Sequence, residues 1–295
     1  GALLEGADKK RYAEINQEVT KLSVQFSQNL LAETNDFEII LDKEDLSGLT
    51  DDIIDLAKLE AENKFSKSKD DKYKDKYVFT VQRSSMYPFL TYSTRRDLRE
   101  KLYKGYIQRG DNNNEYDNKS ITSKIASLRV EKANILGFES HAHYVLDNTM
   151  AKTPEAVYGL LNQLWAPALK RAKNELKEMQ ILANEEGNNF EIASWDWWHY
   201  AEKVRKDKYD LDEEEIKNYF TLDNTIDGIF KTANKLFGLT FEEKFDLDLY
   251  HPDARVWEVK DNDGSHVGLY IGDYYTRSSK RGGAWMSSFK GQSNF

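Results

Sequence analysis

The sequence predicts a mainly α-helical fold: long helices, with a small antiparallel β-sheet near the C-terminus. Its 295 residues include only 4 prolines, while 32% are charged. Few helix breakers and many charges favour long helices with solvated outer faces. Apolar residues recur at steps of three and four through most of the chain, but alternate with polar ones beyond about residue 247. The length suffices for one or two domains with their own hydrophobic cores.

The first half of the chain is expected to be helical with one short strand. Ile15, Val19, Leu22, Phe26 and Leu30 would share one face of the first helix. Further helices are predicted over residues 51–64, 95–109 and 121–135, and residues 77–82 alternate like a strand. The lysine-rich residues 66–76 read as an exposed loop, and Pro88 is expected to mark a bend.

The second half begins with the strongest helix signal in the sequence. Thr153 and Pro154 make a good N-cap and first helical residue, and an apolar stripe follows from Val157 to Met179, with Pro167 as a potential kink. Two further helices are predicted over residues 195–208 and 213–237, and the second is expected to be interrupted near residue 223. A hairpin with its turn at residues 261–264 and a strand over 283–289 follow.

No linker clearly divides the chain. We expect a helical part over residues 1–135, with its β segment near 77–82, and a second part over 136–295, in which helices precede a small sheet at 247–290. One continuous unit is the alternative.

Composition excludes several classes of protein. The net charge of -9 argues against a broad nucleic-acid surface, and no apolar stretch approaches the roughly 18 residues of a membrane span. With no cysteine, the chain has neither disulfides nor thiolate chemistry. We therefore expect no nucleic-acid or membrane partner. The chain begins with Gly1, so its compartment, cytoplasm or periplasm, stays open.

Motif searches find no catalytic constellation and no metal site. His141 and His143 are two residues apart, which points their side chains in different directions on a helix, so packing or exposure is favoured over metal binding. The aromatic residues 195–200 are interpreted as buried packing rather than a binding platform. The basic residues 278–283 are interpreted as a loop leading into a strand, with anion contact as the alternative.

Several blocks of sequence, in order, resemble a known family. They are LGFESHAHYVLDNTMAKTP at 136–154, WDWWHYAEKVRKDKY at 195–209, HPDARVWEV at 251–259 and GLYIGDYYTRSSKRGGAWMSSF at 268–289. They resemble the zinc oligopeptidases of family M3, the group of thimet oligopeptidase and peptidyl-dipeptidase Dcp. The opening residues 1–16 resemble the upstream part of such enzymes, so the likeness covers nearly the whole chain.

The resemblance implies a partial zincin-like fold and a peptidase that hydrolyses short peptides, releasing dipeptides from the C-terminus. In that family the zinc ligands lie in a His-Glu-Phe-Gly-His helix and a later glutamate, downstream of the last matching block. We therefore expect an internal fragment of a longer zinc enzyme, without catalytic or metal-binding residues, that binds no zinc and is inactive alone.

The resemblance also implies substrate-binding residues. In this family and related enzymes a strand before the zinc helix pairs with the substrate, and the matching segment contains Gly283, Ala284 and Trp285. Small side chains there would allow another backbone to approach closely, although the glycines could instead serve a tight turn. The further candidates for lining the channel or organising the sheet are His251, Arg255, Tyr274 and Arg277.

A rival hypothesis is a non-catalytic helical module that binds peptides and naturally lacks a metal site. Under the fragment hypothesis, truncation would expose apolar surface and favour self-association.

Overall fold

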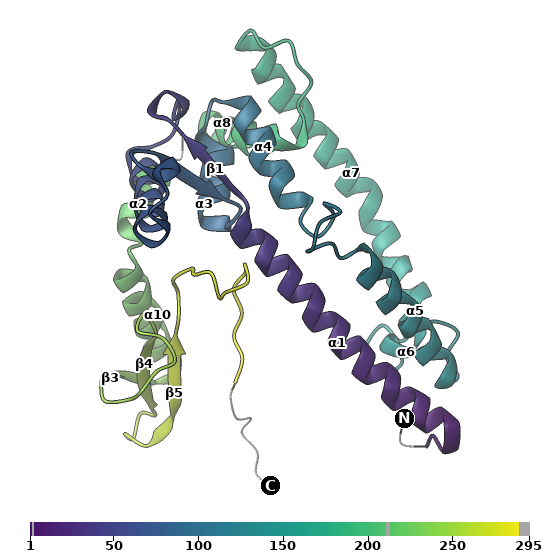
Figure 1. The fold of residues 1–295 in the computed structure, drawn as a ribbon. Helices are drawn as coiled ribbons and strands as arrows, with labels where there is room; N and C mark the ends of the chain where they lie inside the picture. The colour runs from purple at the N-terminus through teal and green to yellow at the C-terminus, as the bar shows by residue number, and fades with distance from the viewer. Residues whose placement is uncertain (2, 211–212, 289–295) are drawn as a thin grey trace. The chain divides into compact units, whose positions relative to one another are not determined.

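The computed structural model describes residues 1, 3–210 and 213–288. It confirms the predicted fold class, because long helices dominate and a small antiparallel sheet lies near the C-terminus (Figure 1). The chain divides into a larger unit, Gly1–Val204 with Ser278–Phe295, and a smaller unit, Arg205–Arg277. In the part of the chain described, no helix is both long and apolar enough to cross a membrane.

Two long helices of the larger unit pack side by side. Helix α1 spans Gly6–Asp36 and contacts α5, which spans Lys119–Ile135 (Figure 1). At one end of this pair, Arg11 donates two hydrogen bonds to Glu131, at 2.6 and 2.7 Å. Further along, the Asn29 amide donates to Asn118 at 3.0 Å in a buried contact. The amphipathic pattern from Ile15 onward therefore predicted α1 correctly.

The main core surrounds a two-stranded sheet. Strand β1, Glu38–Leu41, pairs antiparallel with β2, Tyr77–Thr80. Helices α2, Asp51–Ser68, α3, Arg83–Tyr92, and α4, Arg96–Ile107, complete this region. Phe79 and Phe89 meet edge to face in its centre, with ring centroids 4.6 Å apart. The strand over 77–80 was predicted, whereas its partner β1 was missed because its four residues, Glu-Ile-Ile-Leu, show no alternation of polar and apolar side chains.

Pro88 lies inside α3, so the predicted bend at this residue is wrong. Proline removes one backbone donor from a helix and crowds the preceding turn. Here Met86, Phe89 and Leu90 are buried in the core, and this packing favours the helical conformation. Tertiary contacts therefore outweigh the local preference of proline.

The second half of the larger unit contains α6, His141–Leu146, and α7, Pro154–Glu185. Helix α8, Trp197–Tyr209, begins in this unit and continues past its boundary at Val204. The Thr153 hydroxyl accepts a hydrogen bond from the Ala156 N–H, which confirms the predicted N-cap. Helix α7 continues through Pro167. Near its C-terminal end, Met179 and Ala183 pack with Tyr200 of α8 in a small core.

A buried ion-pair cluster joins the helical core to the start of α8. Asp196 lies in the 3₁₀ turn Ser194–Asp196 and is fully buried. Its carboxylate accepts hydrogen bonds from Arg99 at 2.8 Å and from Arg96 at 2.9 and 3.1 Å. The neighbouring tryptophans are partly buried, and Trp198 stacks on Tyr87 with centroids 5.7 Å apart, so this aromatic cluster does pack as predicted.

In the smaller unit, as far as it is described, a helix packs against a three-stranded sheet. Strands β3, Thr240–Lys244, β4, Arg255–Lys260, and β5, His266–Gly272, pair antiparallel in that order. Short helix α9, Glu213–Ile216, and the 3₁₀ turn Lys217–Tyr219 precede α10, Leu222–Phe237, so the predicted helix is interrupted before residue 222. The β4–β5 hairpin was predicted, and β3, which lies before residue 247, was not.

Aromatic side chains fasten α10 to this sheet. Phe230 stacks on Phe241 with ring centroids 3.9 Å apart and meets Trp257 and Tyr270 edge-on at 5.3 and 5.9 Å.

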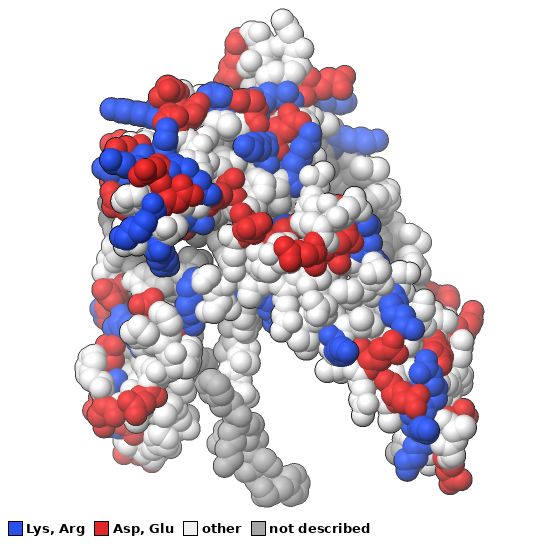
Figure 2. All heavy atoms as spheres, in the orientation of Figure 1, with Lys and Arg blue, Asp and Glu red and all other residues white. Residues whose placement is uncertain are grey.

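Charged side chains of both signs are interspersed over the face of the molecule shown in Figure 2.

Candidate functional site

The predicted substrate-binding residues fall in both units. His251, Arg255, Tyr274 and Arg277 belong to the smaller unit, whereas the segment with Gly283, Ala284 and Trp285 belongs to the larger one.

Asp273 organises the residues that follow strand β5. Arg277 donates two hydrogen bonds to its carboxylate, at 2.9 and 2.7 Å, and the Tyr250 hydroxyl donates a third at 3.1 Å. The Asp273 side chain is only 11% exposed. Such a bidentate, partly buried pair fixes the chain after β5 to the loop around residue 250. Sequence reasoning missed Asp273, because an aspartate after a strand has no distinctive pattern of its own.

Tyr274 folds back against the end of β5. Its hydroxyl lies 2.7 Å from that of Tyr270. A Cβ atom on Gly272 would come within 2.6 Å of the Tyr274 ring, so glycine is required for this close packing. Burial and the hydrogen bond to Tyr270 raise the pKa of Tyr274, which stays a neutral phenol at physiological pH.

Arg255 is held by carboxylates of its own unit. It donates to both Glu243 oxygens, at 2.7 and 2.8 Å, and to Asp223 at 2.8 Å. Its guanidinium carbon lies 4.9 Å from the centre of the Trp257 ring. The carboxylates of Glu243 and Asp223 therefore neutralise the positive charge of Arg255 within the smaller unit. The pair with Glu243 also joins strands β3 and β4.

His251 serves a turn. Its Nδ1 atom accepts a hydrogen bond from the Asp253 N–H at 3.2 Å, and its carbonyl accepts one from the Ala254 N–H at 3.1 Å. The structure thus gives local structural contacts to all four candidates of the smaller unit. Arg277 and Tyr274 lie on one short segment after β5, and Asp273 links this segment to Tyr250, the residue before His251.

The glycine segment of the larger unit is an irregular, exposed stretch with bends at Gly282 and Gly283. The predicted strand over 283–289 is wrong for residues 283–288, and residue 289 lies outside the described part of the chain. Strands require a hydrogen-bonding partner, and none of the strands described pairs with this segment. Trp285 is 65% exposed and Met286 88%. Gly283 has a φ of +125°, which favours glycine.

The start of this segment is tied to α1. The Asn35 amide donates to the Ser278 carbonyl at 2.9 Å. A cavity of about 560 Å³ lies between the same helix and the loop, lined among others by Val19, Ser23, Ser27 and Arg281. The predicted loop over 278–283 is confirmed, but it leads into an irregular stretch rather than into the expected strand.

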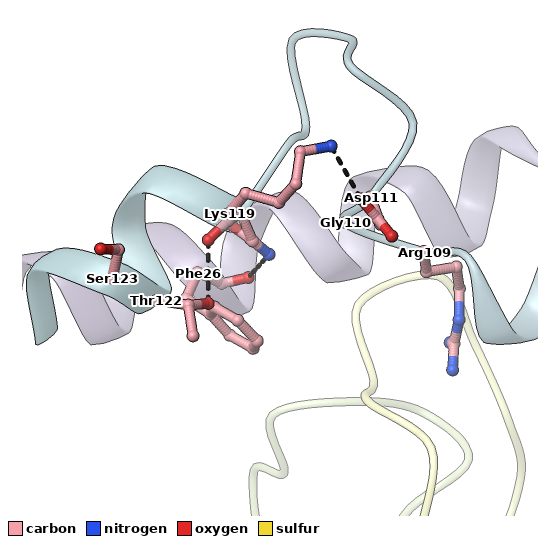
Figure 3. A pocket seen from close by; sticks show the side chains of 8 residues that line it. Phe26, Arg109, Gly110, Asp111, Lys119, Thr122 and Ser123 are labelled. Atoms are coloured by element: carbon pink, nitrogen blue, oxygen red, sulfur yellow. Dashed lines mark hydrogen bonds and ion pairs between the residues drawn. The ribbon is translucent and has the colours of Figure 1, made fainter. Parts of the chain in front are cut away.

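A second cavity, of about 460 Å³, lies beside the loop between α4 and α5 (Figure 3). Lys119 pairs with Asp111 at 2.7 Å across its rim, while Arg109 points away from that pair (Figure 3). Beneath the loop, buried Glu33 accepts hydrogen bonds from Asn112 and Asn114 and from the Gly110 N–H. Burial opposes ionisation of Glu33, yet these donors lower its pKa overall. The polar groups here satisfy one another and stabilise the loop.

No arrangement of ligands for a metal ion occurs within the described ranges, since no three His, Asp or Glu side chains converge. His143 Nδ1 lies 2.8 Å from the Ser140 hydroxyl, and His141 packs near Tyr144. His199 Nδ1 lies 2.9 Å from the Thr91 carbonyl oxygen, which can only accept, so this nitrogen carries the proton.

Comparisons with known proteins place this geometry in context. The sequence model for peptidase family M3 matches residues 89–294. Dipeptidyl carboxypeptidase of Escherichia coli is 38% identical over 295 residues, which cover 99% of this chain and 42% of that protein. Oligopeptidase A of Salmonella typhimurium is 32% identical over 289 residues, covering 96% of this chain and 41% of that protein.

The likeness extends to eukaryotes. Saccharolysin of Saccharomyces cerevisiae is 27% identical over 299 residues, covering 96% of this chain and 40% of its own length. The chain therefore spans about two fifths of the length of the relatives it matches.

Proposed function

This chain belongs to peptidase family M3, and from that membership we propose that it is part of a longer zinc peptidase that hydrolyses short peptides. The observation that carries the proposal is the match over residues 89–294, joined by similarity to peptidases over nearly the whole chain. Removal of dipeptides from the C-terminus is the favoured reaction, because dipeptidyl carboxypeptidase is 38% identical and oligopeptidase A 32%.

The residues described do not fit a catalytic zinc ion. Such an ion takes three protein ligands and a water molecule, and no group of that kind converges in the described residues. In our proposal the ligands and the general base come from another part of the longer polypeptide. The 295 residues by themselves would then have no peptidase activity, and they would supply channel wall and substrate contacts.

We assign the substrate contact to the exposed segment 282–286. Its backbone is accessible, and it carries the small residues Gly282, Gly283 and Ala284. An unpaired extended backbone can receive a second extended chain through main-chain hydrogen bonds. Trp285 would add apolar contact to the peptide, since more than half of its side chain is accessible.

A variant at Ala284 in the longer gene product tests this contact. Ala284→Pro removes the backbone N–H, so we expect KM for a short peptide to rise about tenfold or more, the equivalent of one main-chain hydrogen bond to substrate. Ala284→Ser keeps the N–H and the small volume, and should leave KM within about twofold. Equal KM values for both variants would contradict the assignment.

The alternative is the non-catalytic peptide-binding module. The coding sequence decides between the two. We expect an in-frame His-Glu-x-x-His segment within a few dozen codons after Phe295, which would exclude the module. A stop codon directly after Phe295 would instead favour the module and contradict the enzyme.

A further inference from the structure

Helix α7 carries an exposed apolar face. Every residue from 158 to 174 is exposed, although this stretch contains large apolar side chains. Leu161, Leu164 and Trp165 are 51%, 55% and 68% exposed. Large apolar side chains clustered on one helix indicate a surface that another element covers.

The exposed face continues a face that is buried further along the same helix. At 100° per residue, Leu161 and Met179 fall at the same angle around α7, with Leu164 and Trp165 within about one residue's rotation on either side. Met179 is 2% exposed and packs against α8 in a core that includes Ala183. The opposite face is polar, with Gln163 and Asn174. One continuous apolar stripe of α7 is therefore buried around Met179 and exposed around Leu161.

We infer that the apolar face of α7 over residues 157–176 binds a helical segment of the same longer polypeptide, outside residues 1–295. The matched relatives are more than twice the length of this chain, so a polypeptide of that length would contain ample further helix. The continuity of the stripe with an internal core favours a partner from the same chain over a second copy. At 1.5 Å per residue the bare face is about 30 Å long, which matches a helix of about 20 residues.

Paired substitutions in the longer gene product test the inference. Leu161→Glu with Leu164→Glu would place two carboxylates in the covered face, and we expect the apparent Tm to fall by about 5 °C or more. The control, Gln163→Glu with Asn174→Glu, adds the same charge on the polar face and should lower Tm by about 1 °C or less. In the isolated 295-residue chain, both pairs should have small effects.

A measurement on unmutated protein guards against a variant that fails to fold. Amide hydrogens of residues 158–174 should exchange roughly tenfold or more slowly in the longer protein than in the 295-residue chain. Equal exchange, or equal Tm values for the two pairs, would overturn the inference. A gene product that contains nothing beyond these residues would also overturn it. The same holds if light scattering shows a concentration-dependent dimer that the leucine substitutions dissociate. None of these readouts uses peptide hydrolysis, so they are independent of the proposed activity.

Discussion

Two clusters of charged side chains have nearly the same geometry in very different surroundings. In the larger unit, Arg99 and Asp196 are 2.8 Å apart and their side chains are 2% and 0% exposed. In the smaller unit, Lys244 and Glu258 are 2.9 Å apart and are 27% and 20% exposed. Contact distance alone would rank them equal. The difference in access to water sets their energetic roles, since a charge left alone in the interior has no solvent to replace its partner.

The largest expected effect is at Asp196. Asp196→Ala would leave the Arg99 charge buried without its carboxylate, so the free energy of unfolding should fall by about 3–5 kcal/mol. Urea denaturation measures it. Asp97→Ala on the same helical region is the control, because Asp97 is 62% exposed and should behave as a surface residue. Equal midpoints for the two variants would refute the distinction between buried and exposed pairs.

The next effect is a dependence of stability on pH from His199, which lies beside the same cluster. Burial, with the nearby charges of Arg99 and Lys203, lowers the pKa of His199 to about 4, against the opposing contributions of the Thr91 carbonyl and Glu186. The unfolded chain therefore binds the proton more readily, and stability is lost as pH falls below the ordinary histidine pKa of about 6.5.

Between pH 7.5 and pH 5 this one group should lower the free energy of unfolding by about 2 kcal/mol. Urea titrations at the two pH values measure the change in the free energy of unfolding. The substitution His199→Gln should remove the part of this change that comes from His199. A pH dependence unchanged by the substitution would show that other groups are responsible.

The smallest effect is expected in the partly exposed cluster around Glu258. Lys244 and His266 hold the pKa of Glu258 at about 2, yet water and salt screen such pairs. Glu258→Gln should leave the denaturant midpoint of the smaller unit unchanged within error at 0.15 M salt. A destabilisation as large as that of Asp196→Ala would mean that this cluster is far less hydrated than its exposure indicates.

The same contrast explains what the sequence could predict. Local signals succeeded: Thr153 capping α7, the apolar spacing from Ile15 and the turn at residues 261–264 all act within a few residues. The pairing of Arg99 with Asp196 joins positions 97 apart, and no local pattern announces it. Pro88 and strand β1 were misjudged for the same reason, since packing and strand pairing decide them.

For the candidate site, the family blocks located the segment but not its neighbours. The segment with Gly283 and Ala284 is exposed, but the strand expected there has no partner among the strands described, and its contact with substrate stays a prediction. Asp273 was missed although it binds both Arg277 and Tyr250. Carboxylates that position other residues are hard to find in sequence, because many of the 51 acidic residues look equivalent.

The most direct test of the central claim is a peptidase assay of the 295-residue chain beside the longer gene product, on one short peptide with added zinc. We predict rapid release of dipeptides by the longer protein, abolished by a chelator, and no turnover above background by the 295 residues. Chelator-sensitive hydrolysis by the 295-residue chain itself, or none by the longer protein, would contradict the account.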